Sequence, residues 1–433
     1  MKKASFYTLG CKLNFAETST IARTFAENGF LITKFEDKSD VYIVNTCTVS
    51  QRADKECRKI IRSIIRRSPD AYIIVTGCYA QLRPEEIASI EGVDLVLGTK
   101  EKFQIQNFLS SLDKKKSPQI YVSELSDSND FGIAYSGDVD DRTRAFLKIQ
   151  DGCDFHCSFC TIPLARGESR SQPIDSIINQ AKYLSEKGFK EIVLSGVNVG
   201  DYGKKIGENL LNLLEKLVQI HGIERIRISS IEPNLLSNEL INFILQNEKL
   251  CNHFHIPLQS GSDEILKLMR RRYKVEDYKK LVEYIKTKDP DAAIGADVIV
   301  GFPGETEMHF QETYKFLLDL PISYLHVFTY SERPNTPAAQ SQNQIEPRIR
   351  FERNRKLRLL GKKKKLNFYS KFLTQFIPVL FESNHDDGYM YGFTRNYIRV
   401  RVDYDESLVN KIVPVKIISV DDDVCLGNYL YEP

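Results

Sequence analysis

Short apolar runs alternate with amphipathic segments in the first quarter of the chain. The apolar runs predict buried strands at residues 5–9, 41–44, 72–75 and 95–97. Segments 53–66 and 85–90 carry apolar residues at helical spacing, and Pro69 and Pro84 mark helix boundaries. This alternation predicts βαβ units and a doubly wound, parallel α/β domain over residues 1–112.

A polar and acidic segment, residues 113–141, follows and predicts a domain linker. The alternation then resumes with six apolar strands, at residues 146–150, 192–195, 226–229, 254–258, 296–300 and 325–330. Helical segments such as 174–186 and 263–269 separate these strands. Six strand–helix pairs fall short of a complete (β/α)8 barrel. Residues 142–370 are therefore expected to form a partial (β/α)6 barrel with chemistry at the carboxyl ends of its strands.

The pattern changes again after Pro347. Residues 348–365 form a strongly basic helical stretch. The remaining apolar runs are short strands without helices between them, at residues 376–381, 389–393, 398–402 and 412–420. They predict a small β-barrel over residues 371–433. The fold class is therefore α/β, with an amino-terminal doubly wound domain, a central partial barrel and a carboxy-terminal β-barrel.

Composition narrows the class of protein. The 433-residue chain has a net charge of only +2, so any binding of nucleic acid must come from local basic patches. No apolar run approaches the roughly 20 residues that a membrane span needs, and the start of the chain lacks a signal-peptide core. We therefore expect a cytoplasmic protein without membrane contact, whose nine cysteines serve metal ligation rather than disulfides.

Three cysteines lie within eight residues, directly after the apolar stretch 145–149: they are Cys153, Cys157 and Cys160. An iron–sulfur cube normally takes four cysteine ligands. Three thiolates in one loop therefore leave one iron open, which is useful in an enzyme because a substrate can bind there. Taken alone, the run leaves open a zinc site made by the three cysteines and His156.

Three further cysteines each follow a different strand of the first domain: they are Cys11, Cys47 and Cys78. The carboxyl ends of parallel strands share one edge of a sheet, so these cysteines should converge. Their repeated position favours a second three-cysteine cluster over ordinary buried core cysteines. Cys57 lies inside a basic helix and is interpreted as packing or surface, with a fourth-ligand role left open. Cys251 and Cys425 are isolated and interpreted as structural.

Glycine- or proline-containing motifs follow four strands of the predicted partial barrel, at residues 195–198, 229–233, 255–262 and 301–306. Each motif alone is weak, because glycine and proline mark turns everywhere. Their ordered recurrence behind the cysteine loop is a strong signal. With Thr-Leu-Gly-Cys-Lys-Leu-Asn at residues 8–14 and Pro-Leu-Ala-Arg-Gly at residues 163–167, the chain resembles the radical S-adenosylmethionine (SAM) methylthiotransferases over nearly its whole length.

The resemblance implies SAM and two 4Fe–4S clusters as cofactors. Cys153, Cys157 and Cys160 would hold the SAM cluster, and the cysteines at positions 11, 47 and 78 would hold an auxiliary cluster. It further implies that SAM is contacted by residues from the strand ends, namely Phe159, Gly196, Asn198, Ser229, Glu232, Gln259 and Val300. An electron donor such as flavodoxin or ferredoxin is expected, and the sulfur donor is unknown.

The resemblance also makes the carboxy-terminal barrel a TRAM-type RNA-binding domain. Its cations interleave with Tyr391, Phe393 and Tyr397, a pattern that suits phosphate contact and base stacking. The candidate RNA-binding residues are Arg395, Arg399 and Arg401. The alternative is a solvated barrel face. Basic side chains in residues 52–67 and 270–272 are further candidates for phosphate contacts.

The reaction implied by the resemblance is transfer of a methylthio group to C2 of N6-threonylcarbamoyladenosine, at position 37 beside the tRNA anticodon, with two SAM molecules consumed. Lys12 and Arg166 are candidate contacts to the substrate carboxylate, although each could equally be solvated or face phosphate. Alternatives are the family branches acting on isopentenyladenosine in tRNA or on a ribosomal-protein aspartate. From another class, the alternative is a non-catalytic, zinc-containing RNA-binding protein.

Overall fold

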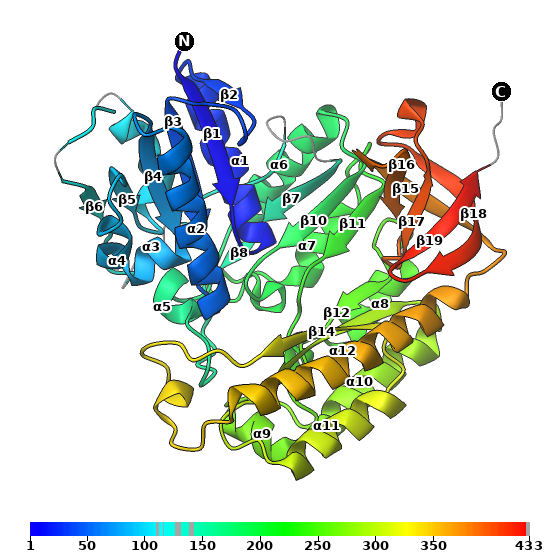
Figure 1. Cartoon of the computed structure of the whole chain (residues 1–433). Helices are drawn as coiled ribbons and strands as arrows, with labels where there is room; N and C mark the ends of the chain where they lie inside the picture. Colours follow the sequence, from blue (N-terminus) through cyan, green and yellow to red (C-terminus); the bar gives the residue numbers. More distant parts are fainter. Residues whose placement is uncertain (110–111, 116, 126–130, 138–142, 430–433) are drawn as a thin grey trace.

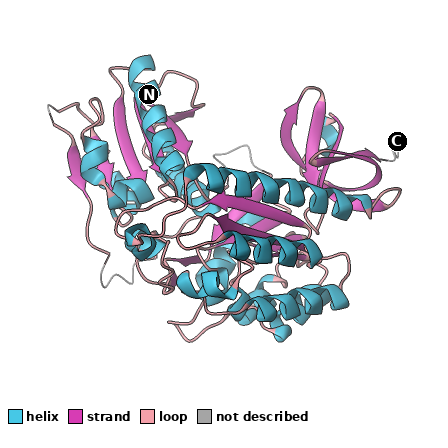
Figure 2. Ribbon diagram, turned by 60° about the horizontal axis from the view of Figure 1, so that its bottom comes forward, coloured by secondary structure: helices cyan, strands magenta, loops and turns pink. Residues whose placement is uncertain are grey.

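The computed structural model describes residues 1–109, 112–115, 117–125, 131–137 and 143–429. An amino-terminal sheet and a carboxy-terminal closed barrel lie on opposite sides of a central part (Figure 1). The same arrangement is visible after a 60° rotation (Figure 2). None of the helices in the described ranges is both long and apolar enough to cross a membrane.

The amino-terminal sheet has six parallel strands in the order β2-β1-β3-β4-β5-β6. Its strands are β1 (Lys3–Thr8), β2 (Leu31–Thr33), β3 (Val41–Thr46), β4 (Tyr72–Gly77), β5 (Leu95–Leu97) and β6 (Gln119–Tyr121). Its helices are α1 (Lys12–Glu27), α2 (Gln51–Arg67), α3 (Cys78–Leu82), α4 (Pro84–Ala88) and the 3-10 helix η1 (Glu101–Phe108). Every residue of β3 and β4 is buried, as expected for parallel strands covered on both faces. The predicted doubly wound sheet is confirmed.

The segment predicted as a linker differs from the prediction in one respect. Part of it forms β6, which pairs with β5 and completes the first sheet. Residues 113–141 are therefore not a linker throughout. The acidic stretches 126–130 and 138–141, on which the linker prediction mainly rested, lie outside the described residues.

Six parallel strands form the central partial barrel, in two three-stranded sheets ordered β11-β10-β7 and β12-β13-β14. They are β7 (Arg144–Lys148), β10 (Glu191–Ser195), β11 (Arg225–Ile228), β12 (His253–His255), β13 (Ala293–Val300) and β14 (Tyr324–Thr329). Parallel bridges from Ile226 to Leu250 and from Ser230 to His255 connect the two sheets. The six predicted strands are thus confirmed. A short antiparallel pair, β8 (Gln150–Asp151) and β9 (Arg170–Ser171), brackets the cysteine loop.

Helices and 3-10 turns lie between and after these strands. They are α5 (Ile162–Arg166), α6 (Ile174–Glu186), α7 (Leu210–Leu217), α8 (Asn238–Gln246), α9 (Asp263–Leu268), α10 (Val275–Lys288), α11 (Glu307–Asp319), α12 (Pro347–Ser370) and the 3-10 turns η2 (Val199–Asp201), η3 (Pro233–Leu235) and η4 (Pro337–Gln340). Side chains alternate across each strand. Leu147, Leu194 and Val298 belong to the main hydrophobic core under the helices. Their strand neighbours, such as Lys148 and Asp297, therefore face the inside of the barrel.

The carboxy-terminal barrel is closed, with strand order β15-β16-β17-β19-β18. Its elements are β15 (Phe376–Asp386), β16 (Tyr389–Phe393), β17 (Arg399–Asp403), η5 (Glu406–Leu408), β18 (Ile412–Asp421) and β19 (Val424–Tyr429). The loop between β16 and β17 docks on the partial barrel: Arg227 donates to the carbonyls of Arg395 (2.9 Å) and Thr394 (3.0 Å). Tyr397 stacks on His253 with ring centroids 4.4 Å apart. The predicted small barrel is therefore confirmed and is attached to the central domain.

Candidate active site between two sets of cysteines

Cys11, Cys47 and Cys78 converge at the carboxyl edge of the first sheet. Cys11 precedes α1, Cys47 follows β3, and Cys78 begins α3. Burial raises the pKa of the Cys47 thiol to about 12, and the nearby Cys78 and Cys11 raise it further. The structure thus brings together the three cysteines that the strand positions predicted would meet.

Glycines make this approach possible. Gly10 has φ +104°, and a Cβ there would lie 2.8 Å from the Cβ of Cys47. Gly77 has φ +98°, and a Cβ there would lie 2.4 Å from the carbonyl oxygen of Thr46. Both positions need the left-handed region and leave no room for a side chain. The glycine before Cys11 and the glycine before Cys78 therefore bring the cysteine loops close to one another.

Cys57 packs beside this set without joining it. Its thiol donates to the carbonyl oxygen of Cys47 at 3.4 Å. The side chain is fully buried in a hydrophobic cluster with Val44, Ile61 and Tyr79. These contacts support the interpretation of Cys57 as a packing residue. Cys251 and Cys425 are likewise buried.

The second set of cysteines lies in the loop between β8 and α5. The N–H of Phe155 donates to Sγ of Cys153, and the N–H of Ile162 donates to Sγ of Cys160, each at 3.4 Å. Burial raises the pKa of Cys160 to about 12. A thiol must lose its proton to bind a metal, so metal binding here is coupled to proton release. The N–H donors stabilise the resulting negative charge.

Arg271 has a role that the sequence interpretation did not predict. Its Nη1 donates to Sγ of Cys157 at 3.1 Å, and its Nη2 forms an ion pair with Glu232. Arg272 places its guanidinium 4.0 Å from the ring centroid of Phe155. Arg271 therefore supports the cysteine loop, and the prediction that it contacts phosphate is wrong, whereas for the exposed Arg272 a phosphate contact stays a prediction. The sequence signal was present, since three arginines in a row follow α9, but it did not indicate which way they point.

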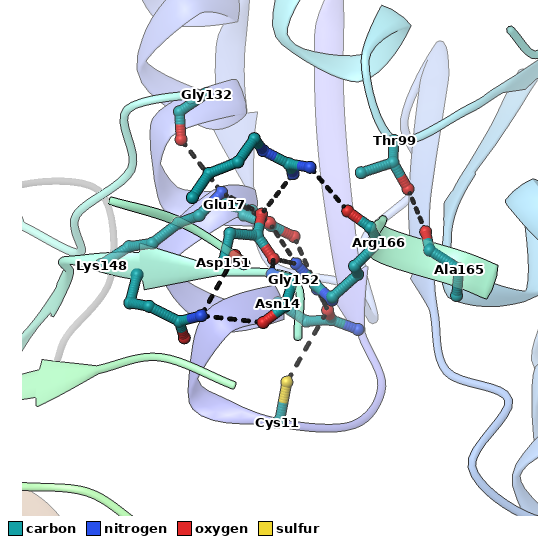
Figure 3. A network of polar contacts seen from close by, with 12 residues as sticks. Cys11, Asn14, Glu17, Thr99, Gly132, Lys148, Asp151, Gly152, Ala165 and Arg166 are labelled. Carbon is teal, nitrogen blue, oxygen red and sulfur yellow. Dashed lines mark hydrogen bonds and ion pairs between the residues drawn. The ribbon is translucent and has the colours of Figure 1, made fainter. Parts of the chain in front are cut away.

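A buried ionic network joins the regions that carry the two cysteine sets (Figure 3). Arg166, whose side chain is 1% exposed, donates to Glu17 and Asp151 at 2.9 Å each and to Asn14 Oδ1 at 2.6 Å. Glu17 and Asp151 also pair with buried lysines, in the contacts Lys102–Glu17 (2.6 Å), Lys148–Glu17 (3.3 Å) and Lys148–Asp151 (2.6 Å). Glu17 and Asn14 lie on α1, which Cys11 precedes, whereas Asp151 and Arg166 flank the loop of Cys153. The network therefore fixes one cysteine set relative to the other.

This network corrects the prediction that Arg166 contacts the substrate. Its guanidinium is buried and occupied by Glu17, Asp151 and Asn14, so it has no exposed face for a carboxylate. Asn14 in turn donates to the carbonyls of Leu9 (2.7 Å) and Thr46 (3.1 Å), in the loops that carry the first cysteine set. Burial alone would raise the pKa of Glu17, but Arg166 and the two lysines hold it well below its usual range.

Three of the predicted SAM contacts carry buried polar atoms without a hydrogen-bond partner among the described residues. These atoms are both side-chain polar atoms of Asn198, Oγ of Ser229 and Oε1 of Gln259. A buried polar group without a partner is costly unless a ligand satisfies it. All three follow strands of the partial barrel, on the edge that carries the cysteine loop. The donor and acceptor set therefore fits a polar cofactor such as SAM.

The other predicted SAM contacts have defined places. A Cβ at Gly196 would lie 2.9 Å from Oε1 of Gln150, so only glycine fits. Phe159 packs edge-on against Phe302, with centroids 6.3 Å apart. Val300 does not fit the prediction: its side chain is 0% exposed in the core, and its carbonyl accepts from Tyr330 at 2.9 Å. It therefore supports the strand and offers no free group.

Comparisons with known proteins decide the family. Residues 147–317 match the Radical SAM superfamily, and residues 3–98 match the uncharacterized protein family UPF0004. The chain is 40% identical over 424 residues to the threonylcarbamoyladenosine tRNA methylthiotransferase MtaB of Bacillus subtilis, covering 96% of this chain and 94% of the relative. The chain belongs to the radical SAM methylthiotransferase family. It is therefore an enzyme, and its family uses SAM and a 4Fe–4S cluster.

Two further proteins are similar to the chain, one in sequence and one in fold. The chain is 35% identical to a tRNA-2-methylthio-N(6)-dimethylallyladenosine synthase of Acetivibrio thermocellus, covering 95% of this chain and 88% of the relative. The radical SAM methyltransferase TsrM of Kitasatospora setae matches with a TM-score of 0.57 and 16% identity, covering 78% of this chain and 75% of that one. The latter similarity shows a shared fold alone.

The methylthiotransferase carries a long basic groove beside its partial barrel. The groove has a volume of about 960 Å³ and lies between β14, α12 and the carboxy-terminal barrel. Cationic and aromatic side chains line it, including Phe328, Arg355, Arg358, Phe393, Tyr397 and Arg399. The sequence marked α12 as basic but gave no sign that it faces a groove.

The three predicted RNA-binding arginines lie in different settings. Arg399 is exposed in the groove, with its guanidinium 4.3 Å from the ring centroid of Tyr391. Arg401 pairs with Asp421 at 2.9 Å. Arg395 donates to the carbonyls of Leu250 (2.7 Å) and Asn247 (3.2 Å), so it docks the barrel on the central domain. The prediction of an RNA contact is wrong for Arg395.

Lys12 lies beside the first cysteine set, near Arg144 and Arg227 of the partial barrel. Burial lowers its pKa to about 8, and the positive charges of Arg144 and Arg227 lower it further. Among the described residues its amine forms no hydrogen bond, so it remains a candidate substrate contact.

Proposed function

We propose that this methylthiotransferase transfers a methylthio group to C2 of N6-threonylcarbamoyladenosine, at position 37 beside the anticodon of tRNA. The observation that carries the proposal is the pairing of two three-cysteine sets on adjoining domains, linked by a buried ionic network. A C–H bond of an aromatic base resists ordinary acid–base chemistry, so such a reaction needs a radical and a separate source of sulfur.

In this proposal Cys153, Cys157 and Cys160 hold the cluster that binds SAM, and the set at positions 11, 47 and 78 holds a second, auxiliary 4Fe–4S cluster. Bound there, SAM and the two clusters supply the radical, the sulfur atom and, from a second SAM, the methyl group. The chain itself positions them. Asn198, Ser229 and Gln259 offer free polar atoms to SAM. Arg271 and two backbone N–H groups stabilise the thiolates of the SAM-side loop.

The spacing of the cysteines disfavours the zinc alternative. Sulfur ligands of a tetrahedral zinc lie about 3.8 Å apart, given a Zn–S bond of about 2.3 Å. Within the described ranges, only His255, Asp297 and His326 bring three potential ligand atoms within 4.8 Å of one another. Within the same ranges neither cysteine set, with or without His156, brings three ligand atoms within that distance.

The substrate branch rests on chemistry and on the relatives. MtaB of Bacillus subtilis, named for threonylcarbamoyladenosine, is 40% identical to the chain, and the dimethylallyladenosine synthase of Acetivibrio thermocellus is 35% identical. A threonylcarbamoyl group brings a carboxylate, a hydroxyl and a urea into the site, whereas an isopentenyl group is hydrocarbon. The inner face of the partial barrel carries polar side chains such as Lys148 and Asp297, and Lys12 of α1 lies near barrel residues Arg144 and Arg227.

We further propose that the anticodon stem-loop lies along the basic groove and that the closed barrel is a TRAM-type domain. Arg399, Arg355 and Arg358 offer charge for phosphates, and the groove aromatics offer stacking surfaces. The electron donor is expected to be flavodoxin or ferredoxin, and the sulfur source stays open.

The test is nucleoside mass spectrometry after incubation of the anaerobically reconstituted enzyme with SAM, sulfide and reductant. Three tRNA substrates are compared, carrying threonylcarbamoyladenosine, isopentenyladenosine or unmodified adenosine. We expect a methylthio product from the first alone, because buried polar groups left unpaired by a wrong substrate can discriminate by about 10⁴-fold or more. A product from isopentenyladenosine alone would contradict the substrate assignment and leave the reaction class intact.

A further inference from the structure

Two histidines and an aspartate form a compact cluster on the inner face of the partial barrel. His255 Nε2 lies 2.7 Å from Oδ1 of Asp297, and His326 Nδ1 lies 3.1 Å from the same oxygen. The three side chains come from the neighbouring strands β12, β13 and β14. Ser230 fixes the ring of His255 from the other side, with Oγ 2.8 Å from Nδ1.

The cluster adjoins the residues proposed to bind SAM. Ser230, which holds His255, directly follows Ser229. The backbone N–H of Gln259 donates to the carbonyl of Asp297 at 2.8 Å. Ser229 and Gln259 both carry unpartnered polar atoms. The cluster therefore lies in the same inner space as the cofactor site.

Lys12 and the cluster share one buried neighbour, His253. The pKa of His253 is held well below its usual range, first by burial and then by positive charge from Arg227, His255, Lys12 and His326. Lys12, which follows Cys11, and the histidine cluster therefore act on one buried ring.

The cluster is also open to the outside. The His326 side chain is 49% exposed, and it lines the basic groove together with Phe328 and Tyr324. β14 is the last strand of its sheet, so among the residues that the structure describes no further strand closes this side. A base entering from an RNA strand in the groove would reach His326 first.

Two polar atoms of the cluster point at no protein partner. Asp297 uses Oδ1 for both histidines, and within the described chain its Oδ2 forms no hydrogen bond. His326 uses Nδ1, and its Nε2 forms none either. The cluster thus presents one anionic acceptor beside one imidazole nitrogen, which donates when the ring is protonated. This pair matches a ligand that carries both N–H donors and a carboxylate.

We propose that the His255–Asp297–His326 cluster is the subsite for the polar N6 substituent of the substrate base. Asp297 Oδ2 accepts from the urea N–H groups, and His326 Nε2 donates to the carboxylate. This inference rests on the proposed substrate and assigns the residues that select it. An apolar isopentenyl group would leave both atoms unpaired.

The experiment compares wild type with Asp297→Asn and His326→Ala on anticodon stem-loops carrying three forms of adenosine. The forms are threonylcarbamoyl, the glycine analogue of that group, and unmodified. The measured quantity is the ratio of kcat/KM for the threonylcarbamoyl form to that for the unmodified form. We expect each variant to lower this ratio by about 10-fold to 100-fold, because a hydrogen bond to a charged group is lost. The glycine analogue should follow the threonyl form, since it keeps the urea and the carboxylate.

His385→Ala is the matched control, because His385 is an exposed histidine on β15, where it packs against Tyr404. It should leave the ratio unchanged. All variants should keep the iron content and the SAM cleavage of wild type measured without RNA. These readouts separate loss of selectivity from loss of folding.

Each contrary outcome has a distinct meaning. If wild type acts on threonylcarbamoyladenosine but the two variants keep its ratio, the inference is wrong and the proposed function stands. If one equivalent of zinc is present in wild type and lost in both variants, the cluster is a metal site and the inference is wrong. If wild type methylthiolates only tRNA carrying isopentenyladenosine in the nucleoside mass-spectrometry test, the proposed substrate and this inference fall together.

Discussion

The two cysteine sets are built in opposite ways. Cys153, Cys157 and Cys160 belong to one loop, and neighbouring backbone N–H groups of that loop donate to two of the sulfurs. The set in the first domain meets only because β1, β3 and β4 lie side by side and two glycines allow their loops to touch. One set is therefore local to the sequence, and the other exists only in the folded sheet. The loop set can be recognised from the short spacing of its cysteines in the sequence. The set in the first domain can be predicted only from the positions of its cysteines at the ends of parallel strands.

The largest expected effect comes from removing one set at a time. Replacing Cys11, Cys47 and Cys78 together by alanine should lower the iron content from about eight to about four atoms per chain, given four per cube. SAM cleavage should continue, because the loop set and its supporting Arg271 are untouched. Replacing Cys153, Cys157 and Cys160 should instead abolish SAM cleavage. Iron and sulfide analysis with a deoxyadenosine assay measures both.

Stoichiometric zinc with little iron would contradict the assignment of both clusters. Loss of SAM cleavage in the variant lacking the first set would show that the two sites are not separable. Alanine variants of Cys251 and Cys425, which are buried outside both sets, are the controls and should retain all iron.

The next effect concerns the network that joins the sets. Glu17→Gln leaves three buried cations facing Asp151, and breaking a buried pair costs about 3–5 kcal/mol in the free energy of unfolding. Glu283→Gln is the control, because Glu283 lies in a half-exposed pair with Lys279 and should change stability by less than about 0.5 kcal/mol. Denaturant unfolding of the metal-free protein measures both.

The difference in the free energy of unfolding between wild type and Glu17→Gln should depend on pH, and its direction follows from the lowered pKa of Glu17. The folded pKa of Glu17 is lowered below its ordinary value of 4.5. Its stabilising contribution is therefore complete above that value and is lost as the pH falls through the folded pKa. The gap between wild type and Glu17→Gln should be constant from neutral pH to about pH 5 and should shrink in more acidic solution. A gap that widens in acid would contradict the charge assignment.

The sequence predicts the strands well because parallel strands covered on both faces are continuous apolar runs. It misses β2 and β6 because each has three residues and is partly exposed, so neither gives such a run. It misplaces Arg166 because the partner Glu17 is 149 residues away and a loop arginine carries no sign of burial. It misplaces Arg395 because alternation of arginine and aromatic residues looks the same whether the arginine faces RNA or a neighbouring domain.

Cys57 gives a smaller effect that sharpens the comparison. It lies next to the first set and donates to the Cys47 carbonyl, but its side chain belongs to the core. Cys57→Ala should keep the full iron content and product formation, and it should lower the free energy of unfolding by about 1–3 kcal/mol through lost packing. Iron analysis and denaturant unfolding decide it. Loss of a whole cluster would make Cys57 a ligand and would mean that the first set has been assigned wrongly.

The smallest expected effect separates the two kinds of arginine in the carboxy-terminal barrel. Arg399 is exposed in the basic groove, so Arg399→Gln should weaken tRNA binding and reduce the slope of log K against log salt by about one. Arg395→Gln should leave that slope unchanged, because Nη2 of Arg395 donates to the carbonyls of Leu250 and Asn247 and so holds the side chain against the central domain. It should instead loosen the docking of the barrel, which limited proteolysis measures. Deleting the barrel is a less clear test, since it would expose Arg227 after removing the carbonyls that this buried residue binds. Equal salt slopes for the two variants would show that the groove does not carry the RNA.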